Sequence, residues 1–260
     1  MELNLKGYLD SFRDKYIVLS TVVDVVFFAV MGPILYLFKL FTDSKTQEFL
    51  GGRTQQQLQD VIVNNPEQGQ IIAQQLQSFM INFGLGVILI VLLSLFLFSL
   101  TRGYLWNKLL NKNFTKKKYW RWNSLNLALI LPTLIYLVFV FIVRIIYLQT
   151  YSAINNQAAF SFISEIISLV LIVIYLIFLF LIYYSFTFRY KVWQSIGEGF
   201  KLVKTRWNTI WRSFIFMLIT LVILTVITSL LTRLFPFQET LLIYVDSVLL
   251  ILFVAWMRVY

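Results

Sequence analysis

The chain has 260 residues, of which 59% are hydrophobic and 18% aromatic, a larger apolar share than a soluble domain carries. Its formal net charge is +10, but the basic residues lie in short segments between apolar runs, which indicates membrane phospholipids and not nucleic acid as partners. The absence of His and Cys excludes His-based acid–base catalysis, thiol nucleophiles, disulfides and metal sites built on those residues. We therefore expect a membrane protein that is not an enzyme and holds no metal or cofactor.

Six apolar segments have the composition of membrane-spanning helices. The first five are near or above the ~20 residues that a tilted helix needs, and the sixth is short. In chain order they are Tyr16–Phe38, Met80–Leu100, Leu125–Tyr147, Phe160–Tyr184, Ile210–Leu231 and Leu241–Met257. The predicted fold class is an all-α, polytopic membrane helical bundle in which residues 1–260 form a single membrane domain.

The charges between these segments predict how the bundle lies in the membrane. Most of the 22 Lys and Arg residues fall in three basic segments, residues 1–15, 102–123 and 189–209. The positive-inside rule places these segments and both termini in the cytoplasm, with the protein in the cell membrane. The 7 Trp residues lie on the same side, and we expect them to form an aromatic belt at the interface with anionic phospholipids.

Each basic segment precedes a pair of apolar segments, so the chain divides into three similar parts of the same orientation. The three basic segments have an amphipathic character that is typical of helices lying in the membrane surface. The six spans are therefore expected to form three helical hairpins, each preceded by an interfacial amphipathic helix.

Segment 189–209 carries the clearest amphipathic pattern. Its apolar residues recur at spacings of three and four, which predicts one stripe on a helix. They are Trp193, Ile196, Phe200, Val203 and Trp207. Gly197 and Gly199 within it indicate a bend or close packing. The basic residues expected to face lipid headgroups are Lys201, Lys204 and Arg206 in this segment and Lys116, Lys117, Lys118 and Arg121 in the preceding one.

One long polar segment, residues 42–79, is predicted to lie on the opposite, outer side of the membrane. It is rich in Gln, and Asn65-Pro66 followed by Gln68 is typical of a helix start with Pro in the first helical position. Another short helix is expected before Pro66. We interpret the segment as a helical cap on the outer end of the bundle, and a binding surface for an external partner is the alternative.

Four ionisable side chains fall within the predicted spans, where a charge is unfavourable and calls for a partner or a function. Arg144 and Glu165 lie near the outer ends of two successive spans, and we expect them to form an ion pair. Asp24 lies close enough to the cytoplasmic end of its span to reach basic residues there. Asp246 is nearest the middle of the membrane and is the candidate for a transport or proton-relay role; a hydrogen-bonded contact between helices is the alternative.

The repeated pattern of an interfacial helix and a hairpin resembles a known family. Its most characteristic part is WQSIGEGFKLVKTRWNTIWRSFIFMLITLVILTVITSLL, residues 193–231. The chain is similar to the six-helix membrane domain fused to some bacterial glycerophosphodiester phosphodiesterases, and equally to the stand-alone prokaryotic relatives of that domain. In the fused proteins a separate soluble domain carries the catalysis, so the resemblance implies a membrane module and no esterase activity.

Two classes of function remain open. The first is a non-enzymatic membrane module that organises lipid or partner proteins, a second copy of the chain included. The second is a transporter or permease-like bundle. A transporter requires Asp246, Asp24 and span hydroxyl groups such as those of Ser168 and Thr220 around one hydrated cavity, whereas a module buries them in pairwise contacts.

Overall fold

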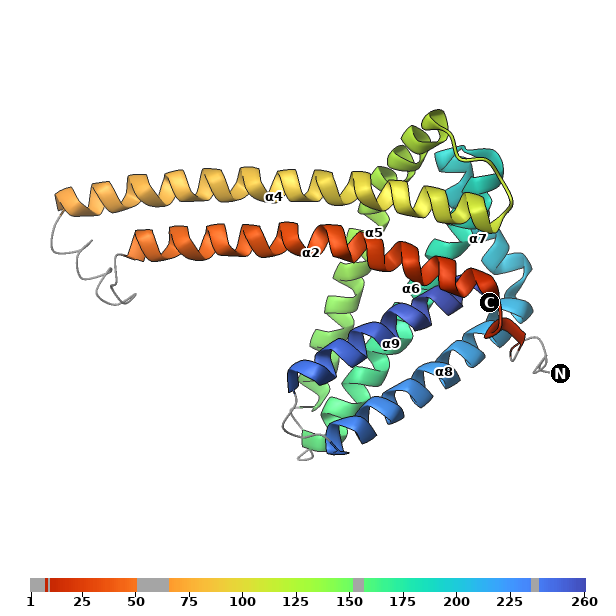
Figure 1. Cartoon of the computed structure of the whole chain (residues 1–260). Helices are drawn as coiled ribbons and strands as arrows, with labels where there is room; N and C mark the ends of the chain where they lie inside the picture. Colours follow the sequence, from red (N-terminus) through yellow and green to blue (C-terminus); the bar gives the residue numbers. More distant parts are fainter. Residues whose placement is uncertain (1–7, 9, 51–65, 152–156, 235–238) are drawn as a thin grey trace. The chain divides into compact units, whose positions relative to one another are not determined.

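The computed structural model describes residues 8, 10–50, 66–151, 157–234 and 239–260 (Figure 1). These residues are largely helical and contain no strand. The helices are α2 (Lys15–Leu50), α4 (Pro66–Leu109), α5 (Lys116–Tyr151), α6 (Gln157–Arg189), α7 (Val192–Thr205), α8 (Trp207–Leu234) and α9 (Glu239–Val259). The predicted all-α class is therefore confirmed for the described part of the chain.

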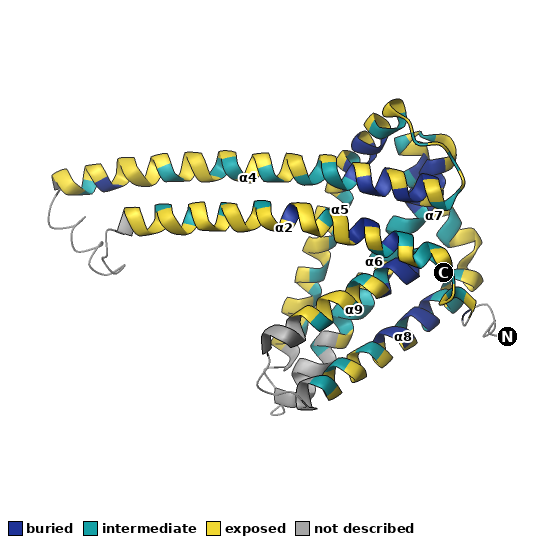
Figure 2. Ribbon diagram, in the orientation of Figure 1, coloured by how far each residue is buried: buried dark blue, intermediate teal, exposed yellow. Residues whose placement is uncertain are grey.

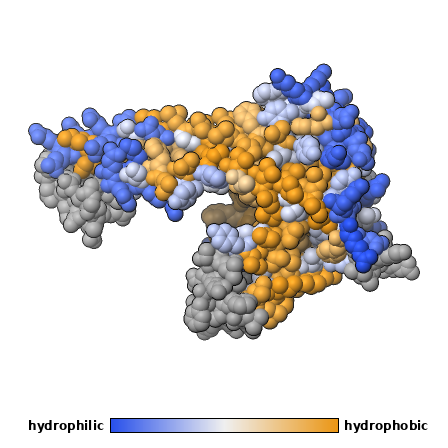
Figure 3. Space-filling model, viewed as in Figure 1, coloured by the Kyte–Doolittle hydropathy of each residue, from blue (hydrophilic) through white to orange (hydrophobic). Residues whose placement is uncertain are grey.

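Five of these helices, α2, α4, α5, α6 and α8, are long and apolar enough to cross a membrane. They contain the first five predicted spans, as expected of a multi-pass membrane protein. Much of the surface that is exposed in Figure 2 is hydrophobic in Figure 3. Because a bilayer offers the backbone no hydrogen-bond partners, such sequences adopt helices whose peptide groups bond internally.

The sixth predicted span coincides with α9, which is a helix of 21 residues. The side chains of residues 239–243 lie outside the described residues. The crossing of the membrane by α9 and the arrangement of the spans in three hairpins therefore stay predictions.

The contacts between helices divide the chain into two compact units. Unit 1 comprises residues 1–25 and 99–260, and unit 2 comprises residues 26–98. Helices α2 and α4 each contribute one part to each unit, while α5 to α9 belong to unit 1. All three basic segments predicted from the sequence fall in unit 1.

Unit 2 contains apolar parts of α2 and α4, which pack against each other. Ser94 Oγ donates to Met31 Sδ at 3.8 Å, and the ring centroids of Phe38 and Phe83 are 5.7 Å apart. A Cβ atom on Gly86 would lie 2.5 Å from the Phe38 ring, so the missing side chain allows that ring to lie against α4.

The Gln-rich segment 42–79 belongs to unit 2. Helix α4 begins at Pro66, which confirms the predicted helix start, and continues for 44 residues without a break. Residues 42–50 continue α2. The short helix expected before Pro66 falls in residues 51–65, outside the described residues. The described parts of the segment are thus extensions of two long helices, and their position outside the cell stays a prediction.

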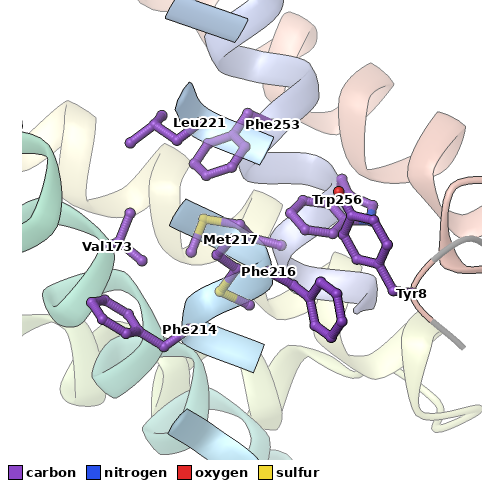
Figure 4. Close-up of a cluster of buried hydrophobic side chains, with 9 residues drawn as sticks. Tyr8, Val173, Phe214, Phe216, Met217, Leu221, Phe253 and Trp256 are labelled. Carbon is purple, nitrogen blue, oxygen red and sulfur yellow. The ribbon is translucent and has the colours of Figure 1, made fainter. Parts of the chain in front are cut away.

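The apolar core of unit 1 lies between α6, α8 and α9 (Figure 4). Tyr8 of the first basic segment belongs to it: its ring stacks on Phe216 with centroids 4.5 Å apart, and its hydroxyl shares a 2.8 Å hydrogen bond with Thr220 Oγ1. Trp256 donates its indole N–H to Ser11 Oγ at 2.8 Å. Residues 8 and 11 of this segment therefore pack against α8 and α9, while residues 1–7 and 9 lie outside the described residues.

The Trp residues correct one prediction. Trp106, Trp122 and Trp256 are 5%, 0% and 2% exposed, because they pack in the interior of unit 1. The exposed members are Trp120, Trp193, Trp207 and Trp211. An aromatic belt of all the Trp residues is wrong, since a side chain buried in the protein cannot reach the lipid interface.

Candidate functional site

A tight reversal joins α7 to the end of α6. Tyr190 adopts a φ of 54°, in the left-handed region, directly after the last residue of α6. One turn and a half into α7, the Glu198 carboxylate accepts a 2.5 Å hydrogen bond from Ser185 Oγ and pairs with Arg189 Nη1 at 2.6 Å. These contacts fix α7 against the final turns of α6.

The buried face of α7 consists of small residues. Ser195 and Gly199 are buried, and a Cβ atom on Gly199 would lie 2.7 Å from Ile182 Cγ1 of α6. Gly197, in contrast, has no neighbouring atom within 4 Å of the same position. Because α7 runs unbroken from its first to its last residue, the glycines mark no bend. Gly199 marks close packing, which was the alternative expectation.

The outward face of α7 carries aromatic and basic side chains together. Trp193 is 77% exposed and Phe200 is 62% exposed, with the Phe200 ring also touching Phe178 at 4.5 Å between centroids. Lys201 and Lys204 are exposed on the same helix.

The helix predicted in segment 189–209 is confirmed for Val192–Thr205, and its surface has the chemistry of an interfacial helix. The predicted stripe is wrong at Trp207, because the helix ends before Arg206 and Trp207 begins α8. The location of α7 at the inner membrane surface stays a prediction.

Most of the basic residues predicted to face lipid headgroups are exposed on the protein surface. Lys118 is the half-buried exception: its Nζ donates to the Asn113 carbonyl at 2.5 Å and lies 4.9 Å from the centre of the Tyr190 ring. Lys118 therefore links the start of α5 to the reversal between α6 and α7. The exposed members are Lys116, Lys117, Arg121, Lys201, Lys204 and Arg206.

Tyr190 also connects this reversal to α4. Its hydroxyl donates to Asn107 Oδ1, while Asn107 Nδ2 donates to the Gly103 carbonyl at 2.8 Å. Burial raises the pKa of the Tyr190 hydroxyl above its ordinary value, which already keeps the group protonated and a donor at neutral pH. The ends of α4 and α6 are thereby fastened to the start of α7.

Asp24 lies at the centre of a buried ion cluster. Its Oδ1 is 2.5 Å from Arg102 Nη1 of α4, and its Oδ2 is 2.6 Å from Arg258 Nη1 of α9. Arg258 Nη1 also donates to Ser20 Oγ at 2.8 Å. The three charged side chains are 3% to 6% exposed, so two guanidinium groups share one carboxylate away from solvent. The structure thus places Asp24 with two basic residues, as its position in the span led us to expect.

A second buried polar cluster joins α4, α5 and α6. Tyr183 donates its hydroxyl hydrogen to Asn126 Oδ1 at 2.9 Å, and Asn126 Nδ2 donates to Ser99 Oγ at 2.8 Å. All three side chains are buried. Polar groups that are satisfied in this way fix the relative positions of the helices that carry them.

A cavity of about 590 Å³ lies where the start of α2 and helices α4, α6, α7, α8 and α9 approach one another in unit 1. Its wall is mostly apolar, and its charged side chains are Asp14, Arg206 and Arg258. The Asp14 carboxylate already accepts the backbone N–H of Tyr16 at 2.8 Å, where it caps the start of α2. The volume lies in the range of roughly 300–1,000 Å³ that is common for small-molecule sites.

The other predicted intramembrane charges lie outside both clusters. Arg144 is exposed on α5 and donates from Nη2 to Ser168 Oγ at 3.1 Å. The side chain of Glu165 lies outside the described residues, so the Arg144–Glu165 ion pair stays a prediction. Asp246 is exposed on α9, does not line the cavity, and forms no hydrogen bond or ion pair within the described part of the chain.

The sequence predicted basic partners for Asp24 but did not single out Arg102 and Arg258. It assigned both to segments outside the membrane, because the apolar runs stop at Leu100 and Met257. The sequence did indicate that this helix continues, because no Pro or other helix-ending pattern occurs directly after Leu100. Helix α4 ends only at Leu109. Ser99 and Arg102 are then three residues apart on one face of a helix that has not yet ended.

Comparison with known proteins returned no match. No family model matches the chain, and no curated protein and no solved structure matches it. The resemblance to the six-helix membrane domain of the phosphodiesterases therefore stays a prediction.

Proposed function

We propose that the chain is a non-enzymatic, multi-pass membrane module that gathers anionic phospholipid around its basic end, which is formed by α7 and the first turns of α5 and α8. The observation that carries this proposal is the fixed orientation of α7. Glu198 and Gly199 hold the helix to α6, and Trp193 and Phe200 are left exposed beside lysines. Aromatic rings favour the headgroup level, and each Lys or Arg near an anionic surface contributes about 1 kcal/mol.

The polar contacts support a module over a transporter. Asp24 is occupied by two arginines, Thr220 pairs with Tyr8, and Ser168 accepts from Arg144. None of these span residues lines the cavity of unit 1, and neither does Asp246. Pairwise contacts of this kind give no shared polar path for a solute or a proton.

The proposal includes the topology: six helices cross the membrane as three hairpins, and both termini lie in the cytoplasm. The chain has no Cys, so a single introduced Cys can be labelled without background. We expect Lys117→Cys and Lys204→Cys to react with an impermeant thiol reagent only from the cytoplasmic side, and Gln56→Cys only from the outside. Reaction of Gln56→Cys from the cytoplasmic side contradicts this topology.

The lipid-gathering function is tested in vesicles of mixed phosphatidylcholine and phosphatidylglycerol that contain the full chain. Spin-labelled versions of the two lipids report what fraction is immobilised at the protein surface. We expect a larger immobilised fraction for phosphatidylglycerol, and a smaller difference between the lipids in the variant Trp193→Ser/Lys201→Gln/Lys204→Gln. The matched control is Gln194→Ala, an exposed polar change on the same helix.

Equal immobilisation of the two lipids by the unaltered chain overturns the proposed function. The transporter alternative has its own signature in the same vesicles. A proton or solute flux that Asp246→Asn abolishes, and that the α7 variant leaves intact, favours the transporter.

A further inference from the structure

We propose that the cavity of unit 1 binds the head of one anionic amphiphile, a membrane lipid with a phosphate or carboxylate group. This inference rests on the proposed function, in which the basic end of the chain contacts anionic lipid. The proposed function describes a general attraction of lipid to the surface of α7, whereas this inference assigns one specific binding site for a single lipid. The cavity lies in one compact unit, and its wall combines buried hydrogen-bond donors, positive charge and apolar area.

The first argument concerns two buried donors on the cavity wall. Trp106 and Arg258 both line the cavity, with side chains 5% exposed. The indole N–H of Trp106 and the Nε–H of Arg258 have no acceptor within the described part of the chain. Buried donors are normally satisfied. Both nitrogens are closed off from the cavity in this structure, so an oxygen of a bound ligand completes them only after a shift of the Trp106 and Arg258 side chains.

The second argument is charge. Arg258 lines the cavity and shares the carboxylate of Asp24 with Arg102. Arg206 is exposed and also lines the cavity, which places it at the rim, so the charged side chains of the wall are two guanidinium groups and the one carboxylate of Asp14. A phosphate or carboxylate between rim and floor therefore meets guanidinium groups, the side chains best suited to bind such oxygens.

The third argument is the apolar part of the wall. Phe180, Leu181 and Leu202 are half-buried, and Met217 and Met257 are buried. A free phosphate ion would leave this surface uncovered, whereas a hydrocarbon chain attached to the anionic group covers it. The combination of donors at the floor and apolar side walls therefore favours an amphiphile over a soluble anion.

The test measures how tightly single lipid molecules stay bound to the detergent-purified full chain by native mass spectrometry. The chain is titrated with phosphatidylglycerol and, separately, with phosphatidylcholine. We expect one phosphatidylglycerol to bind at least roughly tenfold more tightly than any phosphatidylcholine, because hydrogen bonds to a charged group are among the stronger ones in proteins. Inorganic phosphate added in a third series is expected not to displace the lipid.

Three variants locate the site. Trp106→Phe removes the indole donor and keeps an aromatic side chain, and we expect roughly tenfold weaker binding of the single phosphatidylglycerol. Arg206→Gln removes the rim charge and is expected to weaken binding several-fold, whereas Lys108→Gln, which removes an exposed charge of α4 that does not line the cavity, leaves it unchanged. Thr209→Trp adds bulk at the rim and is expected to abolish the tight site.

The proposal is overturned if phosphatidylcholine binds as tightly as phosphatidylglycerol, if Arg206→Gln and Lys108→Gln have equal effects, or if Thr209→Trp retains the tightly bound lipid. Displacement of the lipid by inorganic phosphate also overturns it, since the site would then take a soluble anion. Arg206 and Thr209 are exposed, so their variants do not depend on repacking the core. A chain that immobilises phosphatidylglycerol in vesicles but holds no single tight lipid refutes this inference and leaves the proposed function standing.

Discussion

Unit 1 joins its helices through buried ion and hydrogen-bond clusters in addition to an apolar core, whereas no buried ion pair joins the two helices of unit 2 among the described residues. In unit 1 three helices meet at Asp24, and three meet at Asn126. In unit 2 the buried side chains among the described residues are Met31 and Ile72, and the contacts between helices include the rings of Phe38 and Phe83. The same membrane-type composition therefore supports two different kinds of helix contact.

This difference matters because the driving force for helix association changes inside a bilayer. Lipid tails are as apolar as Leu, so apolar contacts between helices gain little from excluding lipid, and close packing and polar contacts become more important. Unit 1 has both, at Gly199 and at the ion cluster. We therefore expect substitutions at the contacts of unit 1 to lower stability more than equivalent substitutions in unit 2.

The largest effect is expected at the ion cluster. Asp24→Asn removes the carboxylate that the guanidinium groups of Arg102 and Arg258 share, and removal of one partner from a buried ion pair costs about 3–5 kcal/mol. The free energy of unfolding in detergent measures the loss. Asp246→Asn is the matched control, because that carboxylate is exposed, and it should change stability by no more than about 0.5 kcal/mol. Similar results for the two variants would show that the cluster does not hold unit 1 together.

A medium effect is expected where α7 packs on α6. Gly199→Ala places a methyl group 2.7 Å from Ile182 Cγ1, and overpacking of this kind costs about 1–3 kcal/mol. Gly197→Ala meets no neighbouring atom and should stabilise α7 by up to about 1 kcal/mol through helix propensity. Thermal unfolding of both variants provides the comparison. A Gly199→Ala variant that is as stable as Gly197→Ala would mean that α7 is not held tightly to α6.

The smallest effect is expected in unit 2. Gly86→Ala also creates a close approach, 2.5 Å to the ring of Phe38, but the atom it meets is at the far end of a half-buried side chain that can rotate. We expect the free energy of unfolding to change by no more than about 1 kcal/mol, with Gly84→Ala, which meets no atom, as the control. A loss as large as that of Gly199→Ala would remove the distinction between the two units.

The sequence was most informative where a local pattern determines local structure. The apolar runs predicted five helices of membrane-spanning composition, the three- and four-residue spacing predicted α7, and Pro66 predicted the start of α4. Each of these depends on neighbouring residues alone, because helix formation is governed by spacing, capping and backbone hydrogen bonds within one segment.

The parts that were missed depend on contacts between distant segments. Hydropathy assigned Arg102 and Arg258 to segments outside the membrane, although the helices that carry them continue and bring them to Asp24. The preference of Trp for interfaces is statistical, so it could not show that Trp122 and Trp256 pack in the interior. The cavity could not be predicted from the sequence either, because the residues on its wall come from the first basic segment and six helices.

The ion cluster has a consequence for the order in which the protein is made. Asp24 leaves the ribosome first, Arg102 follows with α4, and Arg258, 234 residues after Asp24, follows with α9. On insertion scales, the transfer of a single carboxylate into a bilayer is unfavourable by about 2.5–3.5 kcal/mol. During synthesis, Asp24 of α2 therefore gains from pairing with Arg102, the first of its two arginine partners to be made. The nascent chain can then form an electrically neutral Asp24–Arg102 pair, and the arrival of α9 converts this pair into the native cluster with its additional positive charge.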